Sequence, residues 1–346
     1  MNPTSMKRSL LTCLLAIAAA CAQAGVGLVQ IPGLKDNGRV TVFYPTATED
    51  SPQKRGPFSL MLAPDAPPLR GNSRLVVISH GSGGNPWVHS NLARTLVQAG
   101  FVVAMPEHHA DNARDPSKPG PASWKIRPAE VSRAIDAVAA DSRFAALLAF
   151  DRVGMYGMSA GGHTALSLAG GRWSPAVLRA HCEANLEADF SSCVGLATRL
   201  RGDGLDWLKK AIALPLIRYH LDDATWYTYS EPRIRAVVAG VPFAADFDAA
   251  SLATPRVPLA LVTAQQDKWL LPRYHSDPVV AACKRCEVLE DMPRGGHGAL
   301  LSPMPPLELL GGVAAELLAD PPGFDRTRLP EVDRKIAAFF TRHLLP

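Results

Sequence analysis

The sequence predicts an α/β fold, in which helices cover both faces of a mostly parallel, doubly wound sheet. Short continuous apolar runs recur along the chain, and segments with helical periodicity separate them. Such runs are typical of parallel strands buried on both faces by crossover helices. The first segment instead alternates apolar and polar residues around a turn signal, which predicts an N-terminal antiparallel hairpin. We expect one domain over residues 25–346, a length that can bury a full core.

The N-terminal elements differ from the rest of the expected sheet. Residues 26–31 and 39–44 are predicted to form two strands, and the Asp-Asn-Gly sequence at 36–38 is predicted to be the turn that joins them. Residues 46–72 contain many proline, aspartate and glycine residues and show no clear period. We therefore expect a surface loop between the hairpin and the core of the sheet.

Strands and helices are expected to alternate after this loop. The expected strands are residues 75–79, 101–105, 152–156, 234–241, 259–263 and 288–289, and the expected helices are 88–98, 128–140 and 330–343. The segment from about 171 to 232 interrupts this alternation with helical stretches and several aromatic residues. Because ligands bind at the carboxyl ends of strands in open α/β sheets, we interpret the segment as a small helical lid insertion. An ordinary surface excursion is the alternative.

The N-terminus has the features of a secretory signal peptide. Lys7 and Arg8 precede an apolar run over residues 10–21, and Ala-Gln-Ala at 22–24 is a small-x-small cleavage pattern. The run is about a dozen residues long, against the roughly 20 that a spanning helix needs. We expect cleavage after residue 24, export to the periplasm or the medium, and no stable membrane span.

A lipoprotein acylated at Cys21 is the minor alternative, since small residues precede this cysteine. The usual leucine three places earlier is absent, because that position is Ala18.

Four of the six cysteines follow the predicted cleavage point: Cys182, Cys193, Cys283 and Cys286. An even number of cysteines in an exported chain predicts disulfides. Spacing favours Cys182 with Cys193 and Cys283 with Cys286, although sequence alone leaves all three pairings of four cysteines open. A second Cys-x-x-Cys pair or a His-x-His cluster at ligand spacing is missing from the sequence, so we expect no metal site.

The charge pattern argues against a nucleic-acid-binding protein. The net charge is +4 and the isoelectric point is near 8.8, and the lysines and arginines are scattered along the chain. We expect a small-molecule partner and no nucleic acid.

The Gly-Met-Ser-Ala-Gly sequence at residues 157–161 is the strongest local signal of chemistry. It directly follows the expected strand 152–156 and precedes a helical run, which is the strand-turn-helix context of a nucleophile elbow. A side chain at either glycine would clash in so tight a turn. The pattern predicts Ser159 as the nucleophile.

A nucleophilic serine needs a histidine base and an acid that orients it, in the chain order serine, acid, histidine. His297 lies in the glycine-rich segment 295–298 after the last expected strand. Asp267 follows the apolar run 259–263, in the loop where the acid is expected. Asp246 and Asp248 are the rivals for the acid, one strand earlier.

An oxyanion hole needs two backbone N–H groups. One is expected from Ala160, the residue after the nucleophile, and the other from the glycine-rich loop 79–84, where Gly81 or Ser82 is the donor. The loop matches neither a Walker A motif nor a dinucleotide fingerprint, so we expect no nucleotide cofactor.

These residues together predict a serine hydrolase that cleaves carboxylic esters without a cofactor. An amidase or peptidase on the same fold is the alternative, since this set of residues does not distinguish amides from esters. A non-catalytic binding protein on the same scaffold is a second alternative.

The chain resembles the predicted dienelactone hydrolase and platelet-activating-factor acetylhydrolase-like branch of the α/β-hydrolases. The residues that carry the resemblance are the loop 79–84, Pro-Glu-His at 106–108, the elbow at Ser159, the loop of Asp267, Gly296 and His297, and the tail 319–325. The likeness spans nearly the whole mature chain and is weakest across the lid insertion. It implies the α/β-hydrolase fold, a serine esterase activity without cofactor, and Ser82 as the second oxyanion donor.

Two departures from this family are visible. Dienelactone hydrolases use a cysteine nucleophile where this chain has Ser159. The acetylhydrolases carry their acid after the earlier strand, where this chain reads Ala-Gly-Val-Pro at 239–242, which favours Asp267 as the acid.

Overall fold

The computed structural model describes residues 25–35 and 37–346. The predicted signal peptide at 1–24 and the alternative acylation site Cys21 lie outside these residues, as does Asp36 of the predicted turn. No helix in the described ranges is long and apolar enough to span a membrane.

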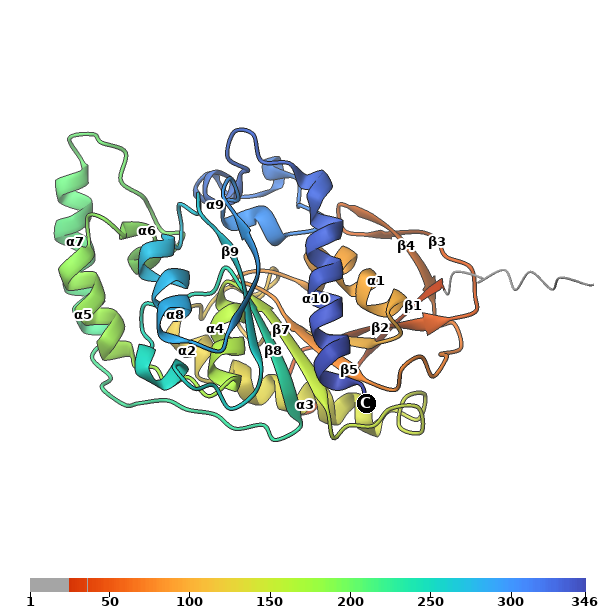
Figure 1. Cartoon of the computed structure of the whole chain (residues 1–346). Helices are drawn as coiled ribbons and strands as arrows, with labels where there is room; N and C mark the ends of the chain where they lie inside the picture. The colour runs from red at the N-terminus through yellow and green to blue at the C-terminus, as the bar shows by residue number, and fades with distance from the viewer. Residues whose placement is uncertain (1–24, 36) are drawn as a thin grey trace, which may run out of the picture.

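Ten strands of the described chain form one sheet in the order β10-β9-β8-β7-β5-β6-β2-β1-β4-β3. Its central and C-terminal part is parallel, as the sequence predicts, and the carboxyl ends of these strands therefore lie at one edge (Figure 1). The parallel strands are β5 (Leu75–Ser79), β6 (Val102–Pro106), β7 (Val153–Met158), β8 (Ile234–Gly240), β9 (Leu259–Ala264) and β10 (Glu287–Met292).

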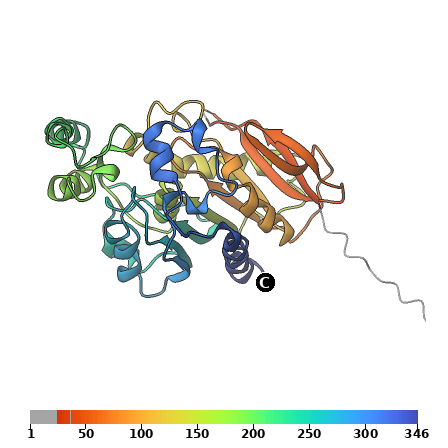
Figure 2. The same cartoon turned by 90° about the horizontal axis from the view of Figure 1, so that it is seen from above.

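The N-terminal hairpin is also confirmed. Strand β1 (Gly25–Ile31) pairs antiparallel with β2 (Val40–Thr46), and β2 pairs antiparallel with β6. The hairpin thus extends the parallel sheet at one end of the molecule (Figure 2).

The prediction of a surface loop over residues 46–72 is wrong, because two strands lie within it: β3 (Ser51–Arg55) and β4 (Phe58–Pro64). Strand β4 has the alternation of a half-buried strand, with Phe58, Leu60 and Leu62 buried and the residues between them exposed. Strand β3 is the outermost strand and has a polar sequence, Ser-Pro-Gln-Lys-Arg, as is common where an edge faces solvent. It therefore has no apolar pattern from which a strand is predicted.

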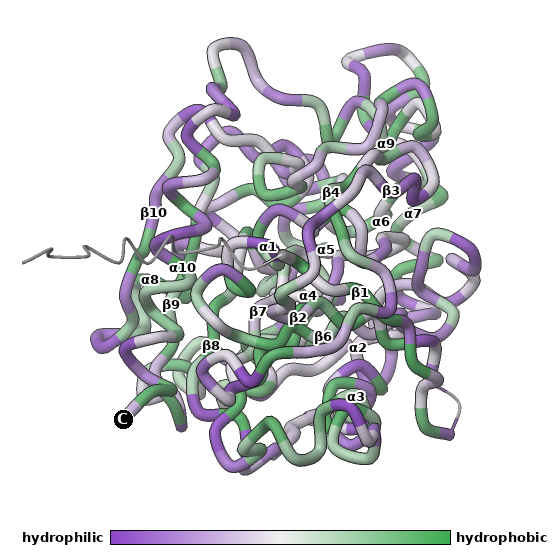
Figure 3. Tube along the Cα trace, turned by 90° about the vertical axis from the view of Figure 1, so that its right-hand side faces the viewer, coloured by the Kyte–Doolittle hydropathy of each residue, from purple (hydrophilic) through white to green (hydrophobic). Residues whose placement is uncertain are grey.

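Helices cover both faces of the sheet. Helices α1 and α10 pack on one face and α3 and α4 on the other, with alternate residues of each parallel strand facing the two layers. In Figure 3 apolar segments run through the central strands and polar ones mark the outer loops. The α-helices outside the insertion are α1 (Ser90–Gln98), α2 (Pro121–Trp124), α3 (Arg127–Ala140), α4 (Ala160–Leu168), α8 (Ser276–Ala282), α9 (Gly312–Leu318) and α10 (Leu329–Leu344). The 3₁₀ turns are η1 (Pro86–His89), η2 (Ala249–Leu252), η3 (Pro272–Tyr274), η4 (His297–Leu300), η5 (Leu307–Leu309) and η6 (Arg326–Arg328).

The insertion at 171–232 contains helices α5 (Pro175–Asn185), α6 (Phe190–Val194) and α7 (Asp206–His220). It lies at the end of the molecule opposite to β1–β4 (Figures 1 and 2). Both disulfides that spacing favours are present: Cys182–Cys193 joins α5 to α6, and Cys283–Cys286 closes the turn between α8 and β10. Two disulfides fit an exported protein.

Two polar contacts tie the insertion to segments near the carboxyl edge of the sheet. Asp189, at the start of α6, lies 3.4 Å from the Nε2 atom of His275, whose Nδ1 atom accepts a hydrogen bond from the N–H of Ala244 just beyond β8. Arg199 pairs with Glu316 of α9. The α6 end of the insertion therefore reaches the edge at which the predicted site residues lie.

Candidate active site

Ser159 lies at the junction of β7 and α4. Its backbone has φ 59° and ψ −118°, a conformation that is strained for a residue with a side chain. The glycines on either side permit the turn: a Cβ atom on Gly157 would lie 1.9 Å from the carbonyl oxygen of Gly161, and one on Gly161 would lie 2.0 Å from that of Ser79. The sequence thus imposes a sharp turn with a serine at its tip.

The structure brings Ser159, His297 and Asp267 into one hydrogen-bonded chain. The Nε2 atom of His297 lies 2.9 Å from the Oγ atom of Ser159, and its Nδ1 atom lies 2.7 Å from Oδ2 of Asp267. Because a carboxylate accepts the Nδ1 hydrogen, the neutral imidazole has its free lone pair on Nε2, facing the serine hydroxyl. All three residues are buried, and Ser159 is the most exposed of them at 8 %.

The loop after β9 fixes the position of Asp267. Its Oδ1 atom accepts hydrogen bonds from the N–H groups of Trp269 and Leu270, both at 2.8 Å, which leaves Oδ2 for His297. The Trp269 ring packs against the His297 ring, with 4.8 Å between centroids. Sequence reasoning did not find Trp269, because nothing in the pattern of this loop distinguishes it from an ordinary core aromatic.

The rival acids have other partners. Asp246 lies 3.1 Å from Nε2 of His163, and both side chains are fully buried in the core behind the elbow. Asp248 caps η2 by accepting the N–H of Ala250 and pairs with Arg172. In the described part of the chain, therefore, Asp267 is the carboxylate that His297 contacts.

The two predicted oxyanion donors lie beside the serine. Ala160 is the first residue of α4, where a backbone N–H has no acceptor within the helix. The loop 80–84 approaches from β5, and a Cβ atom on Gly81 would lie 3.3 Å from Cβ and 3.8 Å from Oγ of Ser159. Among residues 25–35 and 37–346, neither Ala160 N–H nor Ser82 N–H has a hydrogen-bond acceptor.

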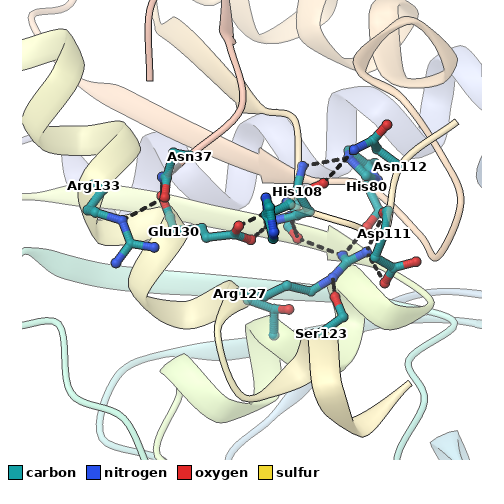
Figure 4. A network of polar contacts seen from close by, with 12 residues as sticks. Asn37, His80, His108, Asp111, Asn112, Ser123, Arg127, Glu130 and Arg133 are labelled. Carbon is teal, nitrogen blue, oxygen red and sulfur yellow. Dashed lines mark hydrogen bonds and ion pairs between the residues drawn. The ribbon is translucent and has the colours of Figure 1, made fainter. Parts of the chain in front are cut away.

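A buried polar network lies behind this loop (Figure 4). Arg127, at the start of α3, pairs with Asp111 at 2.8 Å, and neither side chain is exposed. The guanidinium also donates to the carbonyl oxygen of His80 at 2.6 Å. Sequence reasoning did not identify this ion pair as part of the site.

Two histidines complete the network. His108 bridges the Oγ atom of Ser79 at 2.7 Å and Oε2 of Glu130 at 2.6 Å. Burial holds the pKa of His108 well below its usual range, and the charge of Arg127 lowers it further. Burial likewise lowers the pKa of His80, with His108 and Arg127 adding to the effect, and burial raises the pKa of Glu130. Both imidazoles are therefore neutral near pH 7.

No model of a known protein family matches the chain, and no curated protein matches it significantly. The resemblance to the α/β-hydrolases therefore rests on the motifs quoted above. No group of three or more histidine, cysteine, aspartate or glutamate residues in the described ranges is arranged to hold a metal ion.

Proposed function

We propose that the chain is a serine hydrolase of the α/β-hydrolase type that cleaves carboxylic esters through an acyl-enzyme on Ser159. The observation that carries this proposal is the chain of hydrogen bonds from Asp267 through His297 to Ser159, at 2.7 and 2.9 Å, on a strained turn at the head of a helix. A hydroxyl, a base and an orienting acid in this arrangement are the parts that nucleophilic acyl transfer needs.

In the first half of the reaction, the Oγ atom of Ser159 attacks the ester carbonyl carbon as Nε2 of His297 takes the hydroxyl proton. Asp267 stabilises the imidazolium that forms. The N–H groups of Ala160 and Ser82 bind the oxyanion of the tetrahedral intermediate. When the intermediate collapses, the C–O bond to the leaving alcohol breaks and His297 protonates that alcohol.

In the second half, water attacks the acyl-enzyme carbonyl and gives its proton to His297. The second tetrahedral intermediate expels Ser159, which takes the proton back, and the carboxylic acid leaves. Side chains and backbone groups carry every step of this cycle.

The insertion and the disulfides bear on where and on what the enzyme acts. Because the α6 end reaches the carboxyl edge of the sheet, we propose that the insertion is a lid beside the site. The two disulfides support action in an oxidising compartment, the periplasm or the medium.

The test is a screen of the full-length chain on p-nitrophenyl esters of increasing acyl length beside matched anilides. We expect ester turnover, a fluorophosphonate adduct on the peptide that contains Ser159, and a fall in kcat on the order of 10⁴-fold or more for Ser159→Ala. Faster turnover of anilides than of esters would instead identify an amidase.

Ser167→Ala is the matched control, since Ser167 is a buried serine within α4 whose hydroxyl donates to the carbonyl oxygen of His163. It should keep its activity and its adduct. An adduct on a different residue, or no turnover and no adduct in the unmodified chain, would contradict the proposal and favour a binding protein.

A further inference from the structure

The carbonyl oxygen of Gly81 is held by three donors. They are Nδ1 of His80 at 2.7 Å, the N–H of Gly84 at 3.1 Å, and Nη2 of Arg127 at 3.4 Å. In a planar trans peptide the C=O and N–H bonds point in opposite directions. Fixing the carbonyl of Gly81 therefore fixes the direction of the N–H of Ser82, which points away from these donors.

The hydrogen-bond pattern assigns the tautomer of His80. The N–H of His108 points at Nε2 of His80 at 3.3 Å, and because a backbone N–H only donates, Nε2 is the acceptor. The ring hydrogen of the neutral imidazole is then on Nδ1, where it donates to Gly81. His80 thus acts as a fixed donor to the loop.

The Arg127–Asp111 ion pair contacts the loop on both sides of the peptide bond between Gly81 and Ser82. Arg127 donates to the carbonyl oxygens of His80 and Gly81, while Oδ1 of Asp111 accepts from Ser82 Oγ at 2.6 Å and Gly83 N–H at 3.0 Å. Figure 4 shows the guanidinium of Arg127 beside Asp111 and Ser123. A fully buried charge pair stabilises a fold only when its remaining donors and acceptors are satisfied. Here the oxyanion loop supplies most of these partners, and Ser123 Oγ accepts from Nε of Arg127 at 2.8 Å.

We propose that Arg127 and Asp111 are positioning residues, which hold the Gly81–Ser82 peptide so that the N–H of Ser82 is the second donor to the oxyanion. This inference rests on the proposed function. A donor that is fixed before the charge develops needs no reorganisation during the reaction, which is the source of its effect on rate. The pair therefore acts on the transition state through the loop and does not touch the substrate.

The test compares Asp111→Asn, Arg127→Lys and Ser82→Ala in the full-length chain, with rates expressed per active site titrated by a fluorophosphonate. For Asp111→Asn and Arg127→Lys we expect kcat to fall about 10- to 100-fold. This is less than the fall in kcat when a hydrogen-bond donor of an oxyanion hole is removed completely. The value of KM should stay within about threefold, since the ground state is little affected.

Two further readouts separate positioning from a general loss of structure. The inhibition constant of a trifluoromethyl ketone, which forms a tetrahedral adduct with serine, should rise by the same factor as kcat/KM falls. The pH midpoint of kcat/KM should not move, because in the described residues the side chain of His297 forms hydrogen bonds with Asp267 and Ser159 and with no residue of the loop. Arg233→Lys is the control: Arg233 also forms ion pairs, with Asp136 and Glu231, and it precedes β8 at the opposite edge of the sheet.

If Asp111→Asn and Arg127→Lys do not fold, Ser82→Ala still tests the positioning role, because it leaves the buried ion pair intact. It should lower kcat roughly fivefold, the equivalent of one hydrogen bond, and Ser82→Thr should restore the rate. Unchanged kcat per titrated site in Ser82→Ala and Asp111→Asn, or a lower kcat with an unchanged ketone inhibition constant, would overturn the positioning role while leaving the hydrolase intact. A wild-type chain without ester turnover or adduct would overturn the hydrolase and this inference together.

Discussion

The carboxylate of Asp267 uses its two oxygens for different tasks. Oδ1 accepts two backbone N–H groups and fixes the side chain, and Oδ2 accepts from Nδ1 of His297. An asparagine keeps the first set of bonds if its oxygen takes the Oδ1 position, but it then presents an amide N–H₂ to His297. The imidazole must accept at Nδ1, its hydrogen moves to Nε2, and it loses the lone pair that faces Ser159.

We therefore expect Asp267→Asn to lower kcat on the order of 10³- to 10⁴-fold while the protein remains folded. Steady-state kinetics and thermal denaturation measure the two effects. Asp248→Asn is the matched control, because Asp248 caps η2 and pairs with Arg172 outside the site. Equal losses in the two variants would contradict the assignment of Asp267 as the acid.

Local patterns predicted the candidate site unevenly at the residue scale. The elbow glycines, the glycine-rich segment around His297 and the apolar strand before Asp267 lie next to the residues they identify, so the sequence alone predicted all three. Arg127 has no such neighbours. At the start of an amphipathic helix it has the pattern of a solvated residue, and its burial depends on Asp111 and on a loop 46 positions away. Chain folding creates that environment, and no local motif encodes it.

At the scale of elements, the β7–α4 turn depends on contacts that only glycine allows. A methyl group on Gly161 would meet the carbonyl oxygens of Ser79 and His80 at 2.0 and 3.0 Å, so β5 or α4 would have to shift. We expect Gly161→Ala to destabilise the fold by at least about 2 kcal/mol and to abolish ester turnover, because the shift displaces the loop 80–84 from Ser159.

Gly312→Ala in α9 is the control for this variant. Among the described residues, no atom beyond the chain neighbours and helix backbone of Gly312 lies within 4 Å of a Cβ built on it, so alanine should leave stability unchanged or raise it by up to about 1 kcal/mol. Urea denaturation of the three proteins measures the difference. A Gly161→Ala variant with wild-type stability and kcat would show that the turn tolerates a side chain.

Apolar periodicity predicted the parallel strands and the long helices to within a few residues, because packing between two layers requires that pattern. It failed at β3 and β4 for two reasons. The alternation of β4 is short and lies in a segment dominated by turn residues, and β3 has no apolar side to detect. The edge strand β3 buries too little to leave a pattern in the sequence.

At the scale of the whole molecule, the sequence predicts the helices of the insertion but not where the insertion packs. Its helical stretches were predicted from the interrupted alternation of strands and helices, and α5, α6 and α7 lie in that segment. Its placement depends on long-range contacts, Asp189 with His275 and Arg199 with Glu316, between residues that share no sequence signal. Pairing of α5 with α6 was predictable, because the spacing of Cys182 and Cys193 favours that disulfide.

The stability of the whole domain should depend on pH through Asp333, on the face of α10 that packs against the sheet. Its side chain is 7 % exposed, and burial raises its pKa from 3.8 to about 7, although Arg334 opposes the shift. Its charge also contributes, after burial, to the raised pKa of Tyr156 in β7. The folded state therefore binds this proton more tightly than the unfolded chain does.

The sign of the effect follows from that difference. Below about pH 4 the carboxyl group is protonated in both states, so it does not lower the free energy of unfolding. Between pH 4 and 7 the unfolded chain loses this proton before the folded protein does, so the free energy of unfolding falls as pH rises. Above pH 7 the folded protein carries a buried carboxylate, which lowers the free energy of unfolding by roughly 4 kcal/mol. Asp333→Asn removes the ionisation, so its gain in stability should be present at pH 8 and absent near pH 4.

Urea denaturation of wild type and Asp333→Asn across this range measures the gain, and Glu331→Gln serves as the control because Glu331 is an exposed carboxylate in the same helix. A difference between Asp333→Asn and wild type that does not change with pH would mean that the substitution acts through packing, and that the buried carboxyl does not titrate with folding. A difference that grows between pH 4 and 7 would instead identify a single buried carboxyl, remote from Ser159, as a determinant of the pH range in which the proposed hydrolase stays folded.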